Sequence, residues 1–198
     1  ADRWGGEVRT PFHVIEIEVD RCSLTYGTAP CQAKLGVTGA AKCYNTWQTC
    51  QSPDAFVLQR ESWFFCTPVS DLPKDQNFLP FLQGTPSHSN GSIDPGKSLG
   101  VRSQVSVQLR DAPHHDLTFD RYAHERPQPA QGTFFGRLRA SWPYYYGRTL
   151  RWYSGWLGQS LEEMDRRSYV IEQMKWERDH VSIVAKDPLK LADSDRAK

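Results

Sequence analysis

Residues 12–19 have the sequence Phe12-His13-Val14-Ile15-Glu16-Ile17-Glu18-Val19, and the chain reaches Cys22 three positions later. Apolar and acidic residues alternate along this stretch, and that period is typical of a half-buried β-strand. We therefore predict a strand with Glu16 and Glu18 on its solvent-exposed face. Because the strand runs directly into Cys22, it sets where the next segment of the chain begins.

Four of the five cysteines follow this strand: Cys22, Cys31, Cys43 and Cys50. Glycines and prolines between residues 22 and 54 interrupt any regular helix, so we predict that this segment is a loop. Glycine also lets the backbone approach a metal centre closely and offer N–H groups to its sulfur ligands. Four thiols in one loop indicate a shared centre.

Three kinds of centre compete for these thiols. Two disulfides would require an oxidising compartment, and the start of the sequence lacks the pattern of a secretory signal, so we expect reduced thiols. A structural zinc site usually has a Cys-x2–4-Cys pair, whereas every gap here is longer. An iron–sulfur cluster is larger than one ion and can take ligands from a wrapped loop. Spacing alone leaves cluster and zinc as near-equal alternatives, with disulfides behind them.

The composition describes a folded chain with much polar surface. Aromatic residues make up 12% of the 198 residues, a share that disordered chains avoid. The net charge of +1 gives no general attraction to nucleic acid, and no apolar run is long enough to span a membrane. Many aromatic residues on a polar surface suggest large interfaces with partners.

Beyond the cysteines the chain is predicted to be mainly β. We expect strands at residues 56–58, 63–66, 101–109, 134–140, 149–155, 168–174 and 181–185, with a helical turn near residues 161–164. Residues 67–98 are rich in proline and glycine, and we predict an irregular connection there with one short ordered piece at residues 78–82. Cys66 stands alone in an apolar stretch and is predicted to be a buried apolar residue, or else a reserve ligand.

Several stretches resemble one known family. The segments 22–31 and 42–51, which contain the four cysteines, are similar to the N-terminal part of tail-tip (baseplate) hub proteins of long-tailed siphophages and gene-transfer agents, with the lambda tail-tip protein L as a more distant relative. The resemblance continues through segments 105–111, 132–138 and 145–148 and ends near residue 191. The cysteine loop is its specific part.

The resemblance implies a β-meander or barrel-like phage hub domain with a loop-rich insertion in which Cys22, Cys31, Cys43 and Cys50 hold an iron–sulfur cluster, [4Fe-4S] in type, with zinc as the alternative. It divides the chain into first strands (1–21), cluster loop (22–66), connection (67–98) and β-rich hub domain (99–198), and we expect the native chain to continue past Lys198.

The resemblance also implies a structural virion protein of the tail tip, assembled in the bacterial cytoplasm, rather than an enzyme. It implies a homotrimer that contacts the distal tail protein, the tape-measure protein and tip or fibre proteins, without membrane insertion and without specific nucleic-acid binding, although genome DNA could pass through its channel. The alternative is a soluble iron–sulfur or zinc redox protein or metalloenzyme.

Two further clusters attract a functional interpretation. His114, His115 and Asp116, with Asp111, Asp120 and His124 nearby, resemble a metallohydrolase patch. They lack the helical spacing of such sites, and we interpret them as a charged turn. The tyrosines at 144–146 could stack on bases, but the balanced charge favours an interface or a core position.

Overall fold

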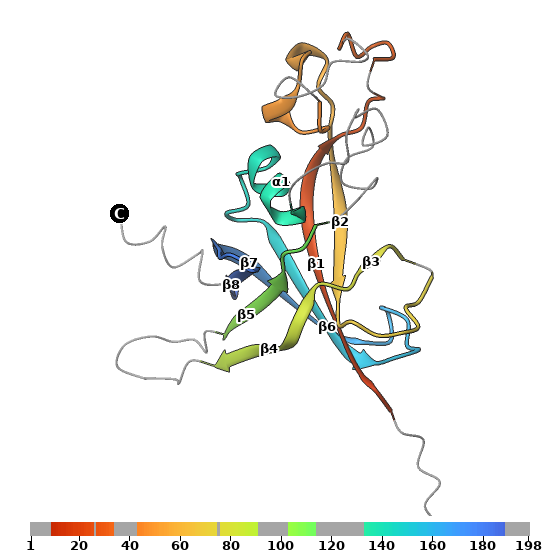
Figure 1. The fold of residues 1–198 in the computed structure, drawn as a ribbon, viewed down its shortest axis with the longest axis vertical. Helices are drawn as coiled ribbons and strands as arrows, with labels where there is room; N and C mark the ends of the chain where they lie inside the picture. The colour runs from red at the N-terminus through yellow and green to blue at the C-terminus, as the bar shows by residue number, and fades with distance from the viewer. Residues whose placement is uncertain are drawn as a thin grey trace, which may run out of the picture.

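The computed structural model describes residues 9–25, 27–33, 43–74, 76–90, 103–113 and 133–188. Within these residues the chain is mainly β, as predicted, with one α-helix (Figure 1). The strands are β1 (Pro11–Cys22), β2 (Leu58–Cys66), β3 (Phe78–Leu79), β4 (Leu82–Asn90), β5 (Ser103–Arg110), β6 (Thr149–Trp156), β7 (Asp165–Trp176) and β8 (His180–Lys186). The helices are α1 (Phe134–Ser141) and two 3-10 turns, η2 (Trp47–Thr49) and η3 (Pro53–Ala55).

All the strands belong to one open sheet, in the order β3-β2-β1-β6-β7-β8-β5-β4. Neighbouring strands are antiparallel except β2 and β3, which are parallel. The longest ladder joins β1 to β2, from the pair Val14–Cys66 to the pair Cys22–Leu58. β1 therefore lies inside the sheet, with β2 on one side and β6 on the other.

The sheet curls back on itself. β3 and β4 occupy its opposite edges. In a flat sheet of eight strands, the two edges would lie about 33 Å apart. Yet only Pro80 and Phe81 separate these strands in sequence. Their ends can therefore be at most about 11 Å apart. The two edges must approach each other, although no ladder is recorded between β3 and β4 in the described residues.

The inside of the curl is filled by apolar side chains and by α1. Phe134, Phe135 and Leu138 of α1 are buried against the strands. Phe65 on β2 is fully buried, and its ring lies 5.9 Å from that of Phe134 and 5.6 Å from that of Phe135. A second, smaller core on the other face contains Phe12, Val14 and Cys66. The described chain thus has a packed centre rather than an open channel.

The helix at residues 134–141 corrects the prediction of a strand at residues 134–140. Thr133 is the N-cap of α1: its hydroxyl accepts from Gly136 N at 3.2 Å and donates to Asp111 Oδ2 at 2.6 Å. The backbone N–H of Phe135 donates to Asp111 Oδ1 at 3.0 Å. These hydrogen bonds satisfy free N–H groups of the first helical turn. Together with the burial of the helix in the main core, they stabilise a helix rather than the predicted strand.

Two more predictions need correction. Residues 82–90 form strand β4, although the sequence predicts an irregular connection over 67–98. Pro86 is tolerated because β4 is an edge strand with an irregularity between Gln83 and Ser87. Residues 58–66 form the single strand β2 rather than two short strands, and Phe56 and Val57 precede it. The sequence predicts a loop over residues 22–66. Because Cys22 belongs to β1 and residues 58–66 belong to β2, the loop covers only residues 23–57.

The outer face of β1 carries an ionic network rather than a solvent-exposed row of acids. Glu16 is only 6% exposed, contrary to the prediction. Arg151, its register partner on β6, donates to Glu16 Oε1 at 2.7 Å and to Glu18 Oε1 at 2.6 Å. The hydroxyl of Tyr153 donates to Glu16 Oε2 at 2.7 Å, and that of Ser62 donates to Oε1 at 2.6 Å. The network ties β2, β1 and β6 together on the face opposite the main core.

We expect Phe65→Ala to lower the free energy of unfolding by about 3–5 kcal/mol, because it leaves a cavity where β2, α1 and the β3–β4 connection meet. Chemical denaturation followed by far-UV circular dichroism measures this loss. The control is Tyr146→Ala, at a side chain that is 66% exposed. This surface change should cost less than about 0.5 kcal/mol. A loss below about 1 kcal/mol for Phe65→Ala would contradict this core.

Candidate metal centre

The loop 23–57 connects β1 to β2 and contains or borders all four candidate ligands. Cys22 is the last residue of β1, is buried, and is paired with Leu58 at the start of β2. Cys43 is also buried, whereas Cys31 and Cys50 are half-buried. Figure 1 shows the described parts of the loop beyond the ends of β1 and β2. The hairpin therefore carries the loop at one end of the sheet.

Asn45 fastens the Cys43 segment to the end of β1. The backbone N–H of Cys22 donates to the carbonyl of Asn45 at 2.6 Å. In return, the Asn45 amide donates to the carbonyls of Cys22 at 3.5 Å and Leu24 at 3.3 Å. Asn45 has a φ of 60°, a left-handed conformation that asparagine tolerates better than most residues. These bonds hold Cys22 and Cys43 in adjacent segments.

Two of the four sulfurs accept backbone hydrogen bonds in the same local pattern. The N–H of Asn45 donates to Cys43 Sγ at 3.4 Å, and the N–H of Ser52 donates to Cys50 Sγ at 3.4 Å. Each donor lies two residues after its cysteine. Such bonds stabilise a thiolate, and hydrogen bonds to sulfur are among the means by which proteins tune metal-bound thiolates.

The cysteines also act on one another electrostatically. Burial raises the pKa of Cys43, the hydrogen bond from Asn45 opposes this rise, and Cys50, Cys31 and Cys22 add to it. For Cys50, burial is again the main cause of a raised pKa, with Ser52 opposing it and Cys22 and Cys31 adding to it. Negative charge on the neighbouring cysteines therefore opposes ionisation of Cys43 and Cys50, and a bound cation would reverse this effect.

The donor set fits a sulfur-ligated centre, but the thiols do not form a closed site. All four are free of disulfides. Among the described residues, no three His, Cys, Asp or Glu side chains form a group that could hold one metal ion. A single tetrahedral zinc ion, with bonds of about 2.3 Å, requires its sulfurs to lie about 3.8 Å apart.

Cys66 is placed far from this group. It pairs with Val14 at the opposite end of the β1–β2 ladder, eight residues along β1 from Cys22. At the rise of an extended strand, that separation is about 26 Å. The Cys66 side chain is fully buried, and burial raises its pKa to about 12. The prediction of a buried apolar residue is thus confirmed, and the alternative of a reserve ligand is wrong.

The structure describes one member of the predicted metallohydrolase patch and all three tyrosines at 144–146. Asp111 caps α1 with both carboxylate oxygens, which is a structural use of that side chain. The other members of the predicted metallohydrolase patch, from His114 to His124, lie outside the described residues. Tyr144 and Tyr146 are exposed and Trp142 is buried, so these aromatic residues split between surface and core.

The roles of Asn45 and of the Ser52 backbone N–H in this loop are not predicted from the sequence. The pattern Cys43-Tyr44-Asn45 contains a residue that favours positive φ two positions after a cysteine, and this was the available signal. The donor role of Ser52 had none, because a backbone N–H carries no side-chain signature.

Comparison with known proteins gives no assignment: no family model matches the chain, and neither a curated protein nor a solved structure is significantly similar to it. None of the helices in the described ranges is both long and apolar enough to cross a membrane.

We expect the five thiols of reduced, metal-free protein to differ widely in reactivity. The pKa of Cys66 is about 12, so at pH 8 it is a thiolate in only about one molecule in ten thousand and should stay unmodified by iodoacetamide. The half-buried Cys31 should react first, and modification of Cys43 should keep accelerating above pH 9, because its pKa is raised. Mass spectrometry of quenched peptides measures these rates. Rapid modification of Cys66 in folded protein would contradict its placement.

Proposed function

We propose that this chain is a structural hub domain of a phage tail tip, in which Cys22, Cys31, Cys43 and Cys50 hold one iron–sulfur cluster that orders the loop 23–57. Its role is to build an assembly rather than to turn over a substrate. The observation that carries the proposal is the gathering of four reduced cysteines from one loop at the end of the β1–β2 hairpin.

The loop needs such a centre because it has little apolar core of its own. Its described core cluster consists of the small residues Ala33 and Cys43, with Cys31 packed against them. Ordering the backbone costs about 1–2 kcal/mol per residue, far more than three small side chains return. A structural metal site can contribute on the order of 10 kcal/mol of folding free energy. We infer that metal binding supplies the folding free energy that the small core of the loop does not.

A cluster fits the cysteines better than a single zinc ion does. In a four-iron cluster each thiolate binds a different iron, so the sulfurs stand farther apart than around one ion. The gaps between the four cysteines are all longer than the Cys-x2–4-Cys pair typical of zinc sites, and they suit this wider arrangement. The N–H donors of Asn45 and Ser52 would stabilise the charge of such a centre. Zinc remains the alternative metal.

The assembly role rests on the resemblance to phage hub proteins and on the exposed aromatic side chains near the loop. Trp47, Tyr144 and Tyr146 are all more than half exposed, and such residues are common at the centres of interfaces. We propose a trimer around the tail axis, with the distal tail protein, the tape-measure protein and tip or fibre proteins as partners. The second candidate, a redox protein or metalloenzyme, is favoured only by the half-exposed thiols of Cys31 and Cys50.

Cys43→Ser should abolish metal binding and loosen the loop while leaving the sheet folded. We expect amide hydrogen exchange in residues 43–57 to approach that of an unstructured peptide, while β6, β7 and β8 keep their protection. Cys66→Ser, in the smaller apolar core, is the matched control. It should keep the metal but cost about 1–3 kcal/mol of stability, because a hydroxyl replaces a thiol in apolar surroundings. If the loop of metal-free Cys43→Ser keeps full protection from hydrogen exchange, the proposal that the metal orders the loop is contradicted.

The assembly state provides a separate test of the hub proposal. Native mass spectrometry of the protein in its assembled form should give a closed ring with the mass of three chains, because a hub surrounds the tail axis symmetrically. A stable monomer within a mature tail would exclude the hub, whatever metal the cysteines bind.

A further inference from the structure

Strand β2 is paired on only one side for much of its length. On one side it pairs with β1 from Leu58 to Cys66. On the other side its only strand neighbour among the described residues is β3, which reaches Phe64 and Phe65 alone (Figure 1). The outer side of residues 58–62 is therefore an open edge of the sheet, which we call the β2 edge.

The register of the β1–β2 ladder determines which backbone groups point to this edge. Just beyond the two ends of the ladder, the N–H of Ser23 donates to the carbonyl of Val57 and the N–H of Thr67 donates to the carbonyl of His13, both at 3.0 Å. Along a strand, alternate residues direct their N–H and C=O groups to the same side. The odd-numbered residues from 57 to 67 thus bond to β1, and the even-numbered ones point outward. The exposed residues whose backbone groups face the β2 edge are Leu58, Arg60 and Ser62.

The β2 edge lacks the features that protect the other sheet edges. β4, at the opposite edge, contains Pro86 and an irregularity between Gln83 and Ser87. β3 is only two residues long. Prolines, irregularities and short strands all prevent unwanted pairing at an edge. The β1–β2 ladder runs without a register shift and residues 58–62 contain no proline, so the β2 edge is regular enough to pair with a further strand.

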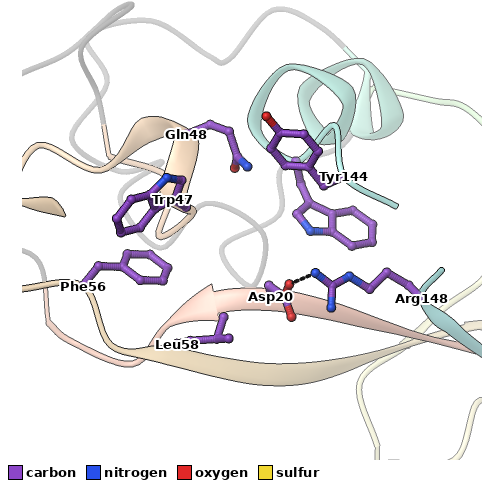
Figure 2. Close-up of a pocket in the computed structure, with 8 residues that line it drawn as sticks. Asp20, Trp47, Gln48, Phe56, Leu58, Tyr144 and Arg148 are labelled. Atoms are coloured by element: carbon purple, nitrogen blue, oxygen red, sulfur yellow. Dashed lines mark ion pairs between the residues drawn. The ribbon is translucent and has the colours of Figure 1, made fainter. Parts of the chain in front are cut away.

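An incompletely paired cation lies in the middle of the β2 edge. The side chain of Arg60 is 64% exposed, and its Nε lies 3.8 Å from Asp20 Oδ1. Asp20 is also the ion-pair partner of Arg148, as the dashed line in Figure 2 shows. Two guanidinium groups therefore share one carboxylate. A second carboxylate beside Arg60 would balance the charge of this group.

We propose that the β2 edge binds an extended strand of a partner protein, with an acidic residue opposite Arg60 and an apolar residue opposite Leu58. Backbone hydrogen bonds to the open edge would supply affinity, and the two side-chain positions would supply specificity. Leu58 is 56% exposed, so an apolar neighbour would cover it.

A second copy of this chain fits the β2 edge less well than a partner strand does. Antiparallel pairing of two such edges over their full length would place one Arg60 directly opposite the other, and like charges in that position are destabilising. The proposal uses the backbone of the sheet and neither the metal nor the hub function. Its test can therefore succeed where theirs fail.

The first test is binding of a model strand to the anaerobically purified full chain. The probe is a fluorescein-labelled, capped peptide, Thr-Val-Thr-Glu-Thr-Val-Thr, whose sequence is the same in both chain directions and so permits parallel or antiparallel pairing. Fluorescence anisotropy should show saturable binding. Of two N-methylated versions, one modified at the valines and the glutamate and the other at the inner threonines, only one should lose binding, because only alternate N–H groups face β2. Equal binding of the two versions, or no binding of the parent peptide, would overturn the proposal.

Amide hydrogen exchange locates the bound strand. In the free protein the backbone N–H groups of Leu58, Arg60 and Ser62 should exchange faster than those of Gln59 and Glu61, which face β1. Saturating peptide should slow the exchange of the outward groups at least about tenfold, as resolved by ¹⁵N NMR. Unchanged exchange of these groups at saturation would overturn the β2 edge as the site.

A charge reversal tests the role of Arg60. Arg60→Glu should weaken binding of the glutamate peptide at least about fivefold, and a peptide with lysine in place of glutamate should restore it. The matched control is Arg166→Glu, the same change at an exposed arginine of β7, which has a strand on each side; it should stay within about twofold. Equal effects of the two substitutions would overturn the pairing with Arg60. A stable dimer of the free chain that the peptide dissociates would overturn the assignment of a partner strand as the occupant.

Discussion

The antiparallel ladder between β1 and β2 determines where every candidate functional element lies. Its register places Cys22 opposite Leu58 at one end and Val14 opposite Cys66 at the other. The loop 23–57 is therefore a hairpin connection, and its cysteines are confined to one end of the sheet. The same register keeps Cys66 in the apolar core. A shift by one residue would exchange the faces of β1 and move its acidic side chains into the main core.

The rest of the sheet makes that ladder rigid. The core inside the curl fixes β1 and β2 from one side through Phe65 and α1, and the ionic network around Glu16 fixes them from the other. Buried carboxylates are costly unless they are fully bonded, and Glu16 has three donors within hydrogen-bond distance. The loop 23–57 is thus weakly packed, whereas the strands that carry it are well packed. In this arrangement a bound metal would add most to the stability of the loop.

Strong alternation made most of the strands predictable from sequence, as at residues 12–19 and 181–185. Local sequence patterns gave wrong predictions where contacts with distant residues determine the secondary structure or the burial. Residues 134–141 form a helix because Asp111 caps them, and Glu16 is buried because Arg151 lies opposite it on a strand more than one hundred residues away. The sequence predicts that the four cysteines form one centre, which stays a prediction, whereas the supporting bonds from Asn45 and Ser52 could not be predicted.

We propose that the four cysteines at the end of the β1–β2 hairpin share one iron–sulfur cluster. The quantitation of iron, acid-labile sulfide and zinc in freshly prepared anaerobic protein tests this cluster most directly. We expect about four iron and four sulfide ions per chain, with a brown colour from thiolate-to-iron absorption. A colourless protein with one zinc ion per chain and no iron would contradict the cluster, and two disulfides among these cysteines would contradict any metal centre.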